Sequence, residues 1–415
     1  MPIDLRDLRE RCAELDRDDP LARSRDQFAL PEGVIYLDGN SLGPLPMETP
    51  IRLARLVERE WGDGLIGSWN HGWVELPMTV GNKIARLVGA GPGEVLAADS
   101  TSANLFKALS AALALRPDRP DILIESGDFP TDAYIAEGVL AQRGQGGRLT
   151  LARREALAES VDGRTGVVVI CHVNYRTGQL HDLARLTTEI QARGALACWD
   201  LSHSVGALPI ELGAAGVDFA VGCGYKFLNG GPGAPGFVFA AGRHLDAVRQ
   251  PLSGWFGHRA PFAFSQRYEP APGIARFACG TPPVLGLAAL ECGVDLALAA
   301  DLTAIRAKSV ALSELLIELV DARCAAYPLE VMSPREPALR GSQVSLTHPN
   351  AHEVCQALIA RGVICDFRPP NILRLGITPL YLRHVDILDA ALALADVLDR
   401  VEWDQPRFRE RLAVT

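Results

Sequence analysis

Lysine is scarce in this chain. Of its 41 basic residues only Lys83, Lys107, Lys226 and Lys308 are lysines, and the other 37 are arginines. Lys226 stands between an apolar run and a glycine-rich loop, in VGCGYKFLNGGPG (221–233). An arginine guanidinium cannot form an imine, whereas the amine of a lysine can. The composition therefore favours a chemical role for Lys226 over the alternative of a solvated surface amine.

Cysteine pairs and long apolar runs are also missing. The nine cysteines stand singly, without a C-x-x-C pair or metal-ligand spacing, so we expect no disulfide framework, no metal site and a cytoplasmic location. No uninterrupted apolar run reaches the ~18 residues of a membrane span, and the charged N-terminus has no apolar signal segment. We therefore expect neither a membrane-bound nor a secreted protein.

Positive charge is not in excess either. The formal net charge is −9, which argues against binding to nucleic acid or to an anionic membrane surface. The length of 415 residues exceeds that of one ordinary single-core domain, so we expect two packed units.

The middle of the chain alternates short apolar runs with helical patterns. This rhythm is typical of βαβ units, and several runs are apolar on both faces, as in a helix-covered parallel sheet. The segment 181–194 has helical spacing and ends in glycine, which suits a crossover helix. The fold class predicted for this part is α/β, with strands at 121–126, 166–173, 195–201, 217–223 and 236–241.

The last part of the chain has a different pattern. An amphipathic helix is predicted at 301–321, followed by short strands at 342–348 and 371–377 with another helix between them. This order indicates a smaller α+β unit. We expect residues 61–295 to form a large α/β domain, and residues 1–60 and 296–415 to form a small domain built from both ends of the chain.

Polar side chains stand directly after three of the predicted strands. Ligands bind at the carboxyl ends of the strands in open α/β sheets, so these residues are expected to converge on one crevice. An aromatic ring, two carboxylates, an imidazole, a phenol and an amine would then meet there: Phe129, Thr131 and Asp132 after the first strand, Asp200 and His203 after another, and Tyr225 and Lys226 after the next.

Each of these residues also has a simpler interpretation. An aspartate such as Asp132 is often a turn or helix cap, and His203 would serve equally as a structural hydrogen-bond donor. Phe129, which precedes a proline, would suit the core. The sequence leaves these alternatives open.

Taken together, the set suits pyridoxal 5'-phosphate (PLP). This cofactor needs an amine for its aldehyde, an anion at its ring nitrogen and a ring stacked on its face. Ser100, Thr101 and Ser102 precede a predicted helix, whose N-terminus favours a phosphate; a helix cap without a ligand is the alternative. A nicotinamide site is weakly supported, because GCGYKF lacks a third glycine and GGPGAPG leads into a strand.

Several motifs resemble a known family. They are YLDGNSLGP (36–44), TSANLF (101–106), FPTD (129–132), VNYRTG (173–178), DLSHSVGA (200–207), GCGYKFLNGGPG (222–233), GWFGH (254–258) and FACGTPP (277–283). Together they resemble the fold-type I PLP enzymes of the class V aminotransferase group, and within it the kynureninase family. The resemblance implies a large domain with a mainly parallel seven-stranded sheet and a smaller α+β domain.

The resemblance also implies roles for individual residues. Lys226 would hold PLP as an internal aldimine and move the proton at the substrate α-carbon, while Asp200 would face the ring nitrogen. Arg374 would bind the substrate α-carboxylate beside Asn40 and Ser41; a surface-facing strand arginine is the alternative for Arg374. Tyr225 would move protons late in the reaction. The remaining cofactor contacts implied are Thr101, Ser102, Phe129, Pro130, Thr131, Asp132, His203, Trp255, Thr281 and Cys171, a cysteine where the family pattern has a hydroxyl residue.

The implied reaction is hydrolysis of L-kynurenine, and of its 3-hydroxy derivative, to the anthranilate and L-alanine, within tryptophan degradation and NAD biosynthesis. The family arrangement implies a homodimer with its site at the subunit interface. The alternatives are a class V transaminase, a cysteine desulfurase using Cys324, Cys355 or Cys365, and a non-catalytic scaffold. A scaffold would be expected to lose Lys226 or Asp200, and both are present.

Overall fold

The chain forms two compact units. The computed structural model describes residues 5–144 and 146–412. The larger unit comprises Glu48–Tyr175 and His181–Leu298, and the smaller one comprises the rest of the described chain. The domain boundaries expected after residues 60 and 295 stay a prediction, because these units are defined by packing and not by independent folding.

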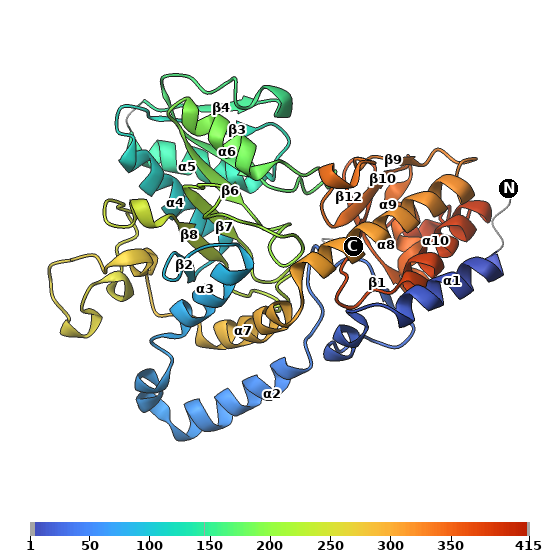
Figure 1. Ribbon diagram of the computed structural model, residues 1–415, viewed down its shortest axis with the longest axis horizontal. Helices are drawn as coiled ribbons and strands as arrows, with labels where there is room; N and C mark the ends of the chain where they lie inside the picture. Colours follow the sequence, from blue (N-terminus) through green and yellow to red (C-terminus); the bar gives the residue numbers. More distant parts are fainter. Residues whose placement is uncertain (1–4, 145, 413–415) are drawn as a thin grey trace. The chain divides into compact units, whose positions relative to one another are not determined.

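The larger unit is built on a seven-stranded sheet in the order β2-β8-β7-β6-β5-β3-β4 (Figure 1). The strands β4, β3, β5, β6 and β7 are parallel, whereas β8 runs antiparallel to β7 and β2 runs antiparallel to β8. The predicted α/β class with a mainly parallel sheet is therefore confirmed. The strands are β2 (Val95–Ala97), β3 (Asp121–Glu125), β4 (Leu149–Ala152), β5 (Thr165–Cys171), β6 (Leu196–Asp200), β7 (Phe219–Gly222) and β8 (Phe237–Ala240).

Helices cover both faces of this sheet. Alternate strand residues, such as Leu196 and Cys198 of β6, belong to one core cluster with α4 (Thr101–Leu115) and α5 (Pro130–Arg143). Trp199 points to the opposite face, where its indole N–H donates to Thr187 of α6 (Leu183–Ala192) at 3.0 Å. Coverage of both faces explains why β3, β5 and β6 are buried along their whole length.

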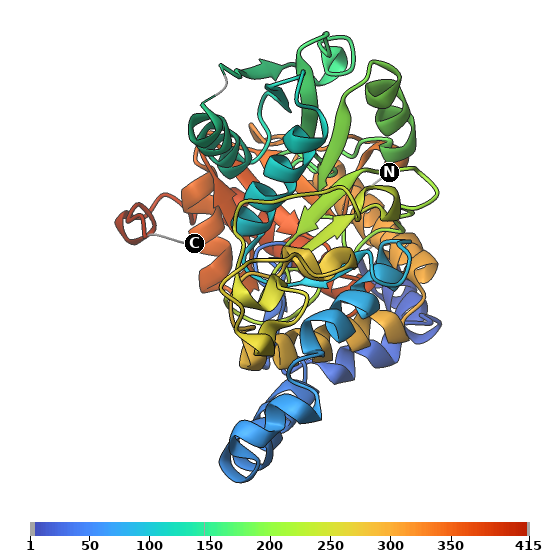
Figure 2. The ribbon, with the colours of Figure 1, turned by 90° about the vertical axis from the view of Figure 1, so that its left-hand side faces the viewer.

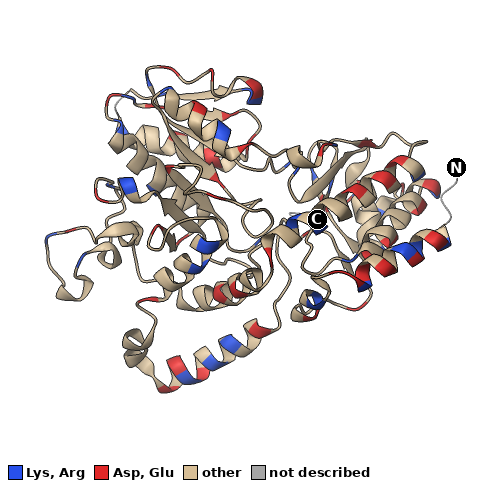
Figure 3. Ribbon diagram, viewed as in Figure 1, with Lys and Arg blue, Asp and Glu red and all other residues tan. Residues whose placement is uncertain are grey.

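Charged residues are placed accordingly. In Figure 3 they lie mainly on helices and loops, and the strands of the large sheet carry few of them. The charged residues of these buried strands stand at strand ends, as Asp121 and Glu125 do in β3 and Asp200 in β6. The positions at the carboxyl ends are the ones that a ligand site can use.

Three further helices complete the larger unit. They are α2 (Glu48–Arg55), α3 (Leu76–Leu87) and α7 (Val284–Ala299). The helix α3 packs against β2, and α2 continues into a π-helical segment, Leu56–Asp63, and then a 3-10 segment, Leu65–His71. Figures 1 and 2 show α2 and its continuation extending away from the sheet of this unit. We call residues 48–71 the α2 arm.

The smaller unit is an α+β structure. Its antiparallel sheet has the order β12-β13-β10-β9, and β1 pairs with β11 in a separate parallel ladder. The strands are β1 (Ile35–Tyr36), β9 (Glu330–Val331), β10 (Gln343–Thr347), β11 (Val363–Ile364), β12 (Asp366–Arg368) and β13 (Ile372–Gly376). Its helices are α1 (Leu5–Arg17), α8 (Leu302–Arg323), α9 (Ala351–Ala360) and α10 (His384–Asp399).

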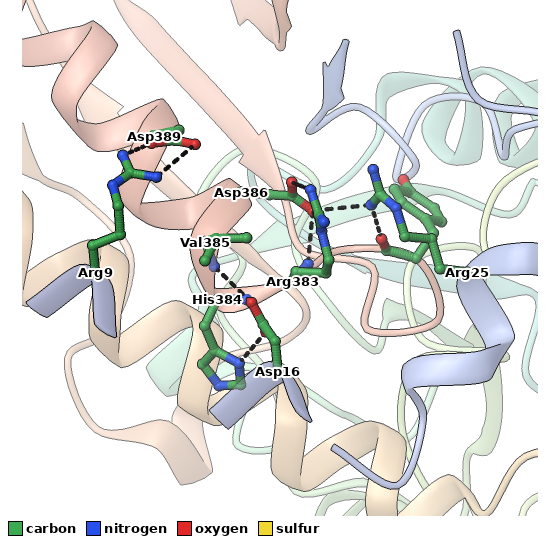
Figure 4. Close-up of polar contacts among 9 residues, drawn as sticks. Arg9, Asp16, Arg25, Arg383, His384, Val385, Asp386 and Asp389 are labelled. Carbon is green, nitrogen blue, oxygen red and sulfur yellow. Dashed lines mark hydrogen bonds and ion pairs between the residues drawn. The ribbon is translucent and has the colours of Figure 1, made fainter. Parts of the chain in front are cut away.

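The N-terminal helix is fastened to the start of α10 (Figure 4). The Asp16 carboxylate accepts from the backbone N–H groups of His384 at 2.6 Å and Val385 at 3.1 Å. These are first-turn N–H groups that lack a partner within their own helix, so a side chain from α1 caps α10. Arg9 adds an ion pair to Asp389. These contacts place both ends of the chain in one unit.

Among the described helices, none combines the length and the apolar character needed to cross a membrane.

Candidate active site

A cavity opens at the carboxyl edge of the large sheet. It is a concave site lined by both apolar and polar side chains, as small-molecule sites are. The residues that line it follow five strands, because β2 runs in the same direction as the parallel strands and contributes the start of α4. The lining residues are Thr101, Ser102, Phe129, Thr131, Asp132, Cys171, Val173, Tyr175, Asp200, Ser202, His203, Tyr225 and Lys226.

Lys226 lies in a tight turn between β7 and β8. Its Nζ is 2.7 Å from Nε2 of His203 and 5.9 Å from the centre of the Tyr225 ring. The turn closes through the N–H of Asn229, which donates to the Lys226 carbonyl at 2.9 Å. A Cβ at Gly224 would lie 2.3 Å from the carbonyl oxygen of Pro235, so the close path of this turn requires glycine there.

Two buried carboxyl groups face the same cavity. Asp200 ends β6, and its Oδ1 accepts from the N–H of Ser202 at 2.7 Å. Asp132 lies in the first turn of α5, and the thiol of Cys171 donates to its Oδ2 at 3.4 Å. Burial raises the pKa of both carboxyl groups, and the nearby Asp200 charge raises that of Asp132 further. We infer that the two carboxyl groups hold one proton between them. Since the Ser202 N–H and the Lys226 charge both favour an ionised Asp200, we place this proton on Asp132.

The same three side chains could in principle hold a metal. Donor atoms of Asp132, Cys171 and Asp200 all lie within 4.8 Å of one another. Burial, however, raises the pKa of the Cys171 thiol well above its ordinary range, and a cysteine binds zinc as a thiolate. A protonated thiol with one ionised carboxylate suits a cationic nitrogen of an organic ring better than a metal ion.

Phe129 is available as a stacking platform. Its side chain is 45% exposed, and its ring contacts that of Tyr175 edge to face with centroids 5.3 Å apart. The alternative that Phe129 belongs to the core is therefore wrong. An exposed ring on a cavity wall offers its face to a flat ligand.

The start of α4 forms another wall. Ser100 is the N-cap, and its Oγ accepts from the N–H of Ala103 at 3.2 Å. Thr101 and Ser102 follow in the first turn and line the cavity. First-turn N–H groups and the helix dipole favour a phosphate at such a position, so this wall fits the anionic end of PLP.

Three of the sequence-predicted cofactor contacts are not lining residues in the described chain. Pro130 is the first residue of α5 and shapes its start. Trp255 is 38% exposed, and its ring packs edge to face on Phe256 and Phe262. Thr281 precedes α7 and is likewise absent from the cavity wall. Their predicted roles stay predictions.

The predicted substrate residues gather in the smaller unit. Arg374 of β13 is 1% exposed, so the alternative of a surface-facing arginine is wrong. Its guanidinium donates from Nε to Oδ1 of Asp366 at 2.9 Å and from Nη2 to the Ser41 hydroxyl at 2.8 Å. The Ser41 hydroxyl in turn donates to Asp366 at 2.8 Å. Asn40 is fully buried, and its amide lies 3.4 Å from the side-chain oxygen of Gln343.

Some residues of these two clusters were missed at the sequence level. Asp128, Tyr175 and Ser202 lie inside or beside recognised motifs, but their side chains carry no pattern of their own. Asp366 stands opposite Arg374 in the antiparallel β12–β13 pair, and only the strand register brings the two together. A charged residue directly after the apolar run GVIC (362–365) was the one available signal.

Asp128 lies near Asp132 but is not among the described residues that line the cavity. It is 8% exposed, and its Oδ2 accepts from the N–H of Cys171 at 2.9 Å. Burial, followed by the charge of Glu125, raises the pKa of Asp128 to about 8. The group is therefore protonated at neutral pH in the folded protein.

Comparison with known proteins gives one consistent result. The kynureninase C-terminal domain family matches residues 305–394. A kynureninase of Burkholderia pseudomallei (strain 1106a) is 52% identical over 413 residues, which cover 98% of this chain and 99% of the relative. A kynureninase of Pseudomonas fluorescens is 51% identical with the same coverage.

Solved structures that resemble this chain share its fold. The apo cysteine desulfurase of Thermococcus onnurineus NA1 has a TM-score of 0.75 at 18% identity, covering 91% of this chain and 96% of its own. A C-DES mutant with glycine covalently linked to its PLP cofactor has a TM-score of 0.77 at 19% identity, covering 90% and 99%. At these identities the similarity establishes the fold-type I architecture, as predicted, and no more.

The raised pKa of Asp128 makes a testable contribution to stability. An aspartate in the unfolded chain has a pKa of about 3.9, so the protonated Asp128 makes its full contribution to the unfolding free energy below that pH. This contribution decreases as the pH rises above about 4 and is lost once the pH has passed about 8. From pH 5 to 8.5, the unfolding free energy of Asp128→Asn should rise relative to the unmodified protein by roughly 2–4 kcal/mol.

Urea denaturation at several pH values measures this difference. The exposed Asp246 of the same unit gives a matched control, Asp246→Asn, whose stability should stay parallel to that of the unmodified protein. A difference between Asp128→Asn and the unmodified protein that does not change with pH would show that Asp128 is ionised in the folded state.

Proposed function

The chain belongs to the kynureninase family, and we propose that it hydrolyses L-kynurenine and 3-hydroxykynurenine at a PLP site centred on Lys226. Membership follows from identity above 50% over nearly the whole chain, and it makes the protein a PLP-dependent hydrolase of a carbon–carbon bond. The observation that carries the site assignment is the convergence of one amine and two buried carboxyl groups on a single cavity.

The residues present fit the cofactor. Lys226 supplies the amine for its aldehyde, Asp200 an anion for its ring nitrogen, Phe129 a stacking surface, and Thr101 and Ser102 a place for its phosphate. When bound, PLP supplies an electron sink for the α-carbon of an amino acid. Asp200 maintains this property, because an ionised carboxylate keeps a facing ring nitrogen protonated.

Lys226 also has the position of a proton carrier. Its Nζ and the Nε2 of His203 are 2.7 Å apart, and a hydrogen bond of this length requires one nitrogen to accept. Both groups therefore cannot be cationic at the same time. When the amine is the accepting nitrogen it is neutral, and in that form it can accept the proton at the substrate α-carbon.

Tyr225 is assigned the late proton transfers. Burial raises the pKa of its phenol, so Tyr225 keeps its proton at neutral pH and can donate it. After water adds to the side-chain ketone, the aryl carboxylate leaves and the β-carbon of the remaining alanine unit needs a proton. The phenol lies on the cavity wall beside Lys226 and is the donor we assign to that step.

Arg374 is assigned the substrate α-carboxylate, with Asn40 and Ser41 beside it. Asp366 holds the guanidinium from one side through Nε and Nη2, which fixes its plane before substrate arrives. A planar, pre-oriented guanidinium binds a carboxylate with two parallel hydrogen bonds.

The proposal includes a cytoplasmic homodimer. The α2 arm exposes apolar side chains, with Ile51 at 63%, Trp61 at 56% and Ile66 at 80% exposure. An apolar groove joins the arm to the segment after Thr281 and is lined by Leu56, Trp61, Trp73, Pro282, Pro283, Val284 and Leu285. Clustered apolar exposure of this kind marks an interaction surface. A second copy of the chain would cover this surface.

The cytoplasmic part of the proposal is supported by the nine free cysteines, which suit a reducing compartment.

The alternatives are not favoured. A cysteine desulfurase needs a mobile, reactive cysteine, yet Cys324, Cys355 and Cys365 are all buried. Full-length relatives above 50% identity are named kynureninase, and none of these names indicates a transaminase. The retained Lys226 and Asp200 argue against a scaffold.

The first test targets Lys226. Lys226→Arg should abolish the visible absorbance of the lysine-bound cofactor and lower anthranilate formation from L-kynurenine by at least ~1,000-fold, because arginine cannot form an imine. Borohydride reduction followed by peptide mass spectrometry should place the adduct on the peptide with residue 226. Lys83→Arg is the matched control, since Lys83 pairs with Glu291 and Asp295 on α7 and arginine can keep those pairs. An adduct on any other peptide would remove the basis of the assignment.

The second test targets Arg374. Arg374→Lys should raise KM for L-kynurenine about 10- to 100-fold while changing kcat less, because a lysine cannot form the two parallel bonds. Arg335→Lys, at an exposed ion pair with Asp321 in the same unit, should leave KM unchanged. Steady-state kinetics checks both values, and an unchanged KM in Arg374→Lys would remove Arg374 from the substrate site.

The third test concerns the dimer. Light scattering should give twice the 44.6 kDa of one chain. Two charged residues introduced on the α2 arm, in the double variant Ile51→Asp/Ile66→Asp, should shift the mass toward one chain, because they place two carboxylates in an apolar contact. Leu151→Asp, at an exposed position of the edge strand β4, is the control. A dimer that tolerates the arm variants would place the interface elsewhere.

A further inference from the structure

We propose that Lys107 is a positioning residue for the phosphate of the cofactor, acting by neutralising Asp99 at the start of α4. The inference rests on the proposed function, since it concerns the same site. Lys107 lines no part of the cavity, and its effect on the ligand would pass through Asp99 and the first turn of the helix.

Lys107 is a fully buried cation with two defined partners. Its side chain is 0% exposed. The Nζ donates to Oδ2 of Asp99 at 2.6 Å and to the carbonyl oxygen of Phe277 at 2.8 Å. A buried ammonium is retained at considerable cost in desolvation, so its placement inside α4 calls for a function.

The backbone of Asp99 is fixed beside the phosphate wall, and its side chain is 35% exposed. It directly precedes Ser100, the N-cap of α4, and its backbone has a φ of +49°, which is unusual for aspartate. Its carbonyl accepts from the N–H of Gly236 at 2.7 Å. Thr101, which lines the cavity, is two residues further on, so the two Cα atoms lie within about 7 Å.

The charge of Asp99 conflicts with the ligand assigned to this wall. The N-terminus of α4 favours a phosphate through its free N–H groups and dipole, and a carboxylate beside it opposes a second anion. The Lys107 ammonium cancels that charge at a distance of 2.6 Å. The strained, fixed Asp99 can then shape the start of α4 without repelling the phosphate.

The Asp99 carboxylate also supports the charge of the lysine. Burial lowers the pKa of the Lys107 amine, and the Asp99 carboxylate counteracts this shift. The charge of the ammonium is thus balanced by the carboxylate that it contacts.

A second buried lysine offers a matched control. Lys308 of α8 is 7% exposed, pairs with Asp19 and donates to the carbonyl oxygen of Pro379 at 2.7 Å. The arrangement of lysine, aspartate and carbonyl is the same as that of Lys107. Lys308 belongs to the smaller unit, whereas all the residues that line the cavity belong to the larger one.

The experiment compares PLP with pyridoxal, which lacks the phosphate. The holoenzyme is freed of its cofactor and titrated with each compound, using protein fluorescence and visible absorbance. Lys107→Met should weaken PLP binding about ten-fold or more and change pyridoxal binding by less than about three-fold, since only the phosphate senses the Asp99 charge. The double variant Lys107→Met/Asp99→Asn should recover most of the lost PLP affinity.

Two further variants keep the proposal testable if Lys107→Met folds poorly. Lys308→Met should lower the unfolding midpoint but preserve the ratio of PLP to pyridoxal affinity. Asp99→Asn removes the negative charge beside the phosphate wall, so PLP should bind as tightly as before or more tightly. Equal losses for the two compounds in Lys107→Met, no recovery in the double variant, or weaker PLP binding in Asp99→Asn would overturn the proposal.

Failure of the proposed function would look different. An unmodified protein that binds PLP no better than pyridoxal would have no phosphate site at all. A borohydride adduct away from residue 226 would displace the whole cofactor assignment. Neither result depends on the Lys107 variants.

Discussion

Two carboxyl groups buried in one cavity are the constraint on which the site depends. Asp132 and Asp200 are 2% and 7% exposed, and two ionised carboxylates at this separation are unfavourable without a compensating cation. The protein meets this constraint with one shared proton and with the Lys226 amine. The remaining negative charge, on Asp200, gives the cavity a strong preference for a cationic ring nitrogen. Burial of the carboxylates thus selects the ligand before any contact with its phosphate or aldehyde is made.

The parallel sheet brings the groups of this site together. Residues from Thr101 to Lys226 reach one cavity because five strands end at the same edge, and the helices α4 and α5 begin there. The strand β2 also ends at this edge. It is antiparallel to β8, which is itself antiparallel to β7, so β2 and β7 run in the same direction. Asp99 then enters α4 in a strained conformation, and the buried Lys107 compensates its charge. The cavity therefore depends on a second layer of paired charges behind its wall.

Much of this arrangement was predictable, for identifiable physical reasons. Strands such as β5 and β6 are buried on both faces and so appear as continuous apolar runs, and the residues after them were correctly expected to line one cavity. The strand β4 was missed because it is a four-residue edge strand with two exposed positions, and β2 because it has three residues. The pair of Asp366 with Arg374 depends on strand register, which a single apolar run does not reveal. Trp255 and Thr281 were placed by resemblance alone, and one chain does not bring them to the cavity.

The scarcity of lysine has a broader meaning than the sequence suggested. Lys107 and Lys308 are buried, and each fits between one carboxylate and one carbonyl. The compact ammonium can pair two of its three donors in such a space, whereas a planar guanidinium would leave more of its five donors without a partner there. Lysine is thus retained where a small cation is required, and Lys83 likewise bridges two carboxylates. Lys226 differs from these three because the partner within hydrogen-bonding distance of its Nζ, in the described chain, is an imidazole. Lys226 also lines the cavity, whereas the other three lysines do not. Its place at the cavity beside an imidazole, more than its rarity, is what makes Lys226 suited to covalent chemistry.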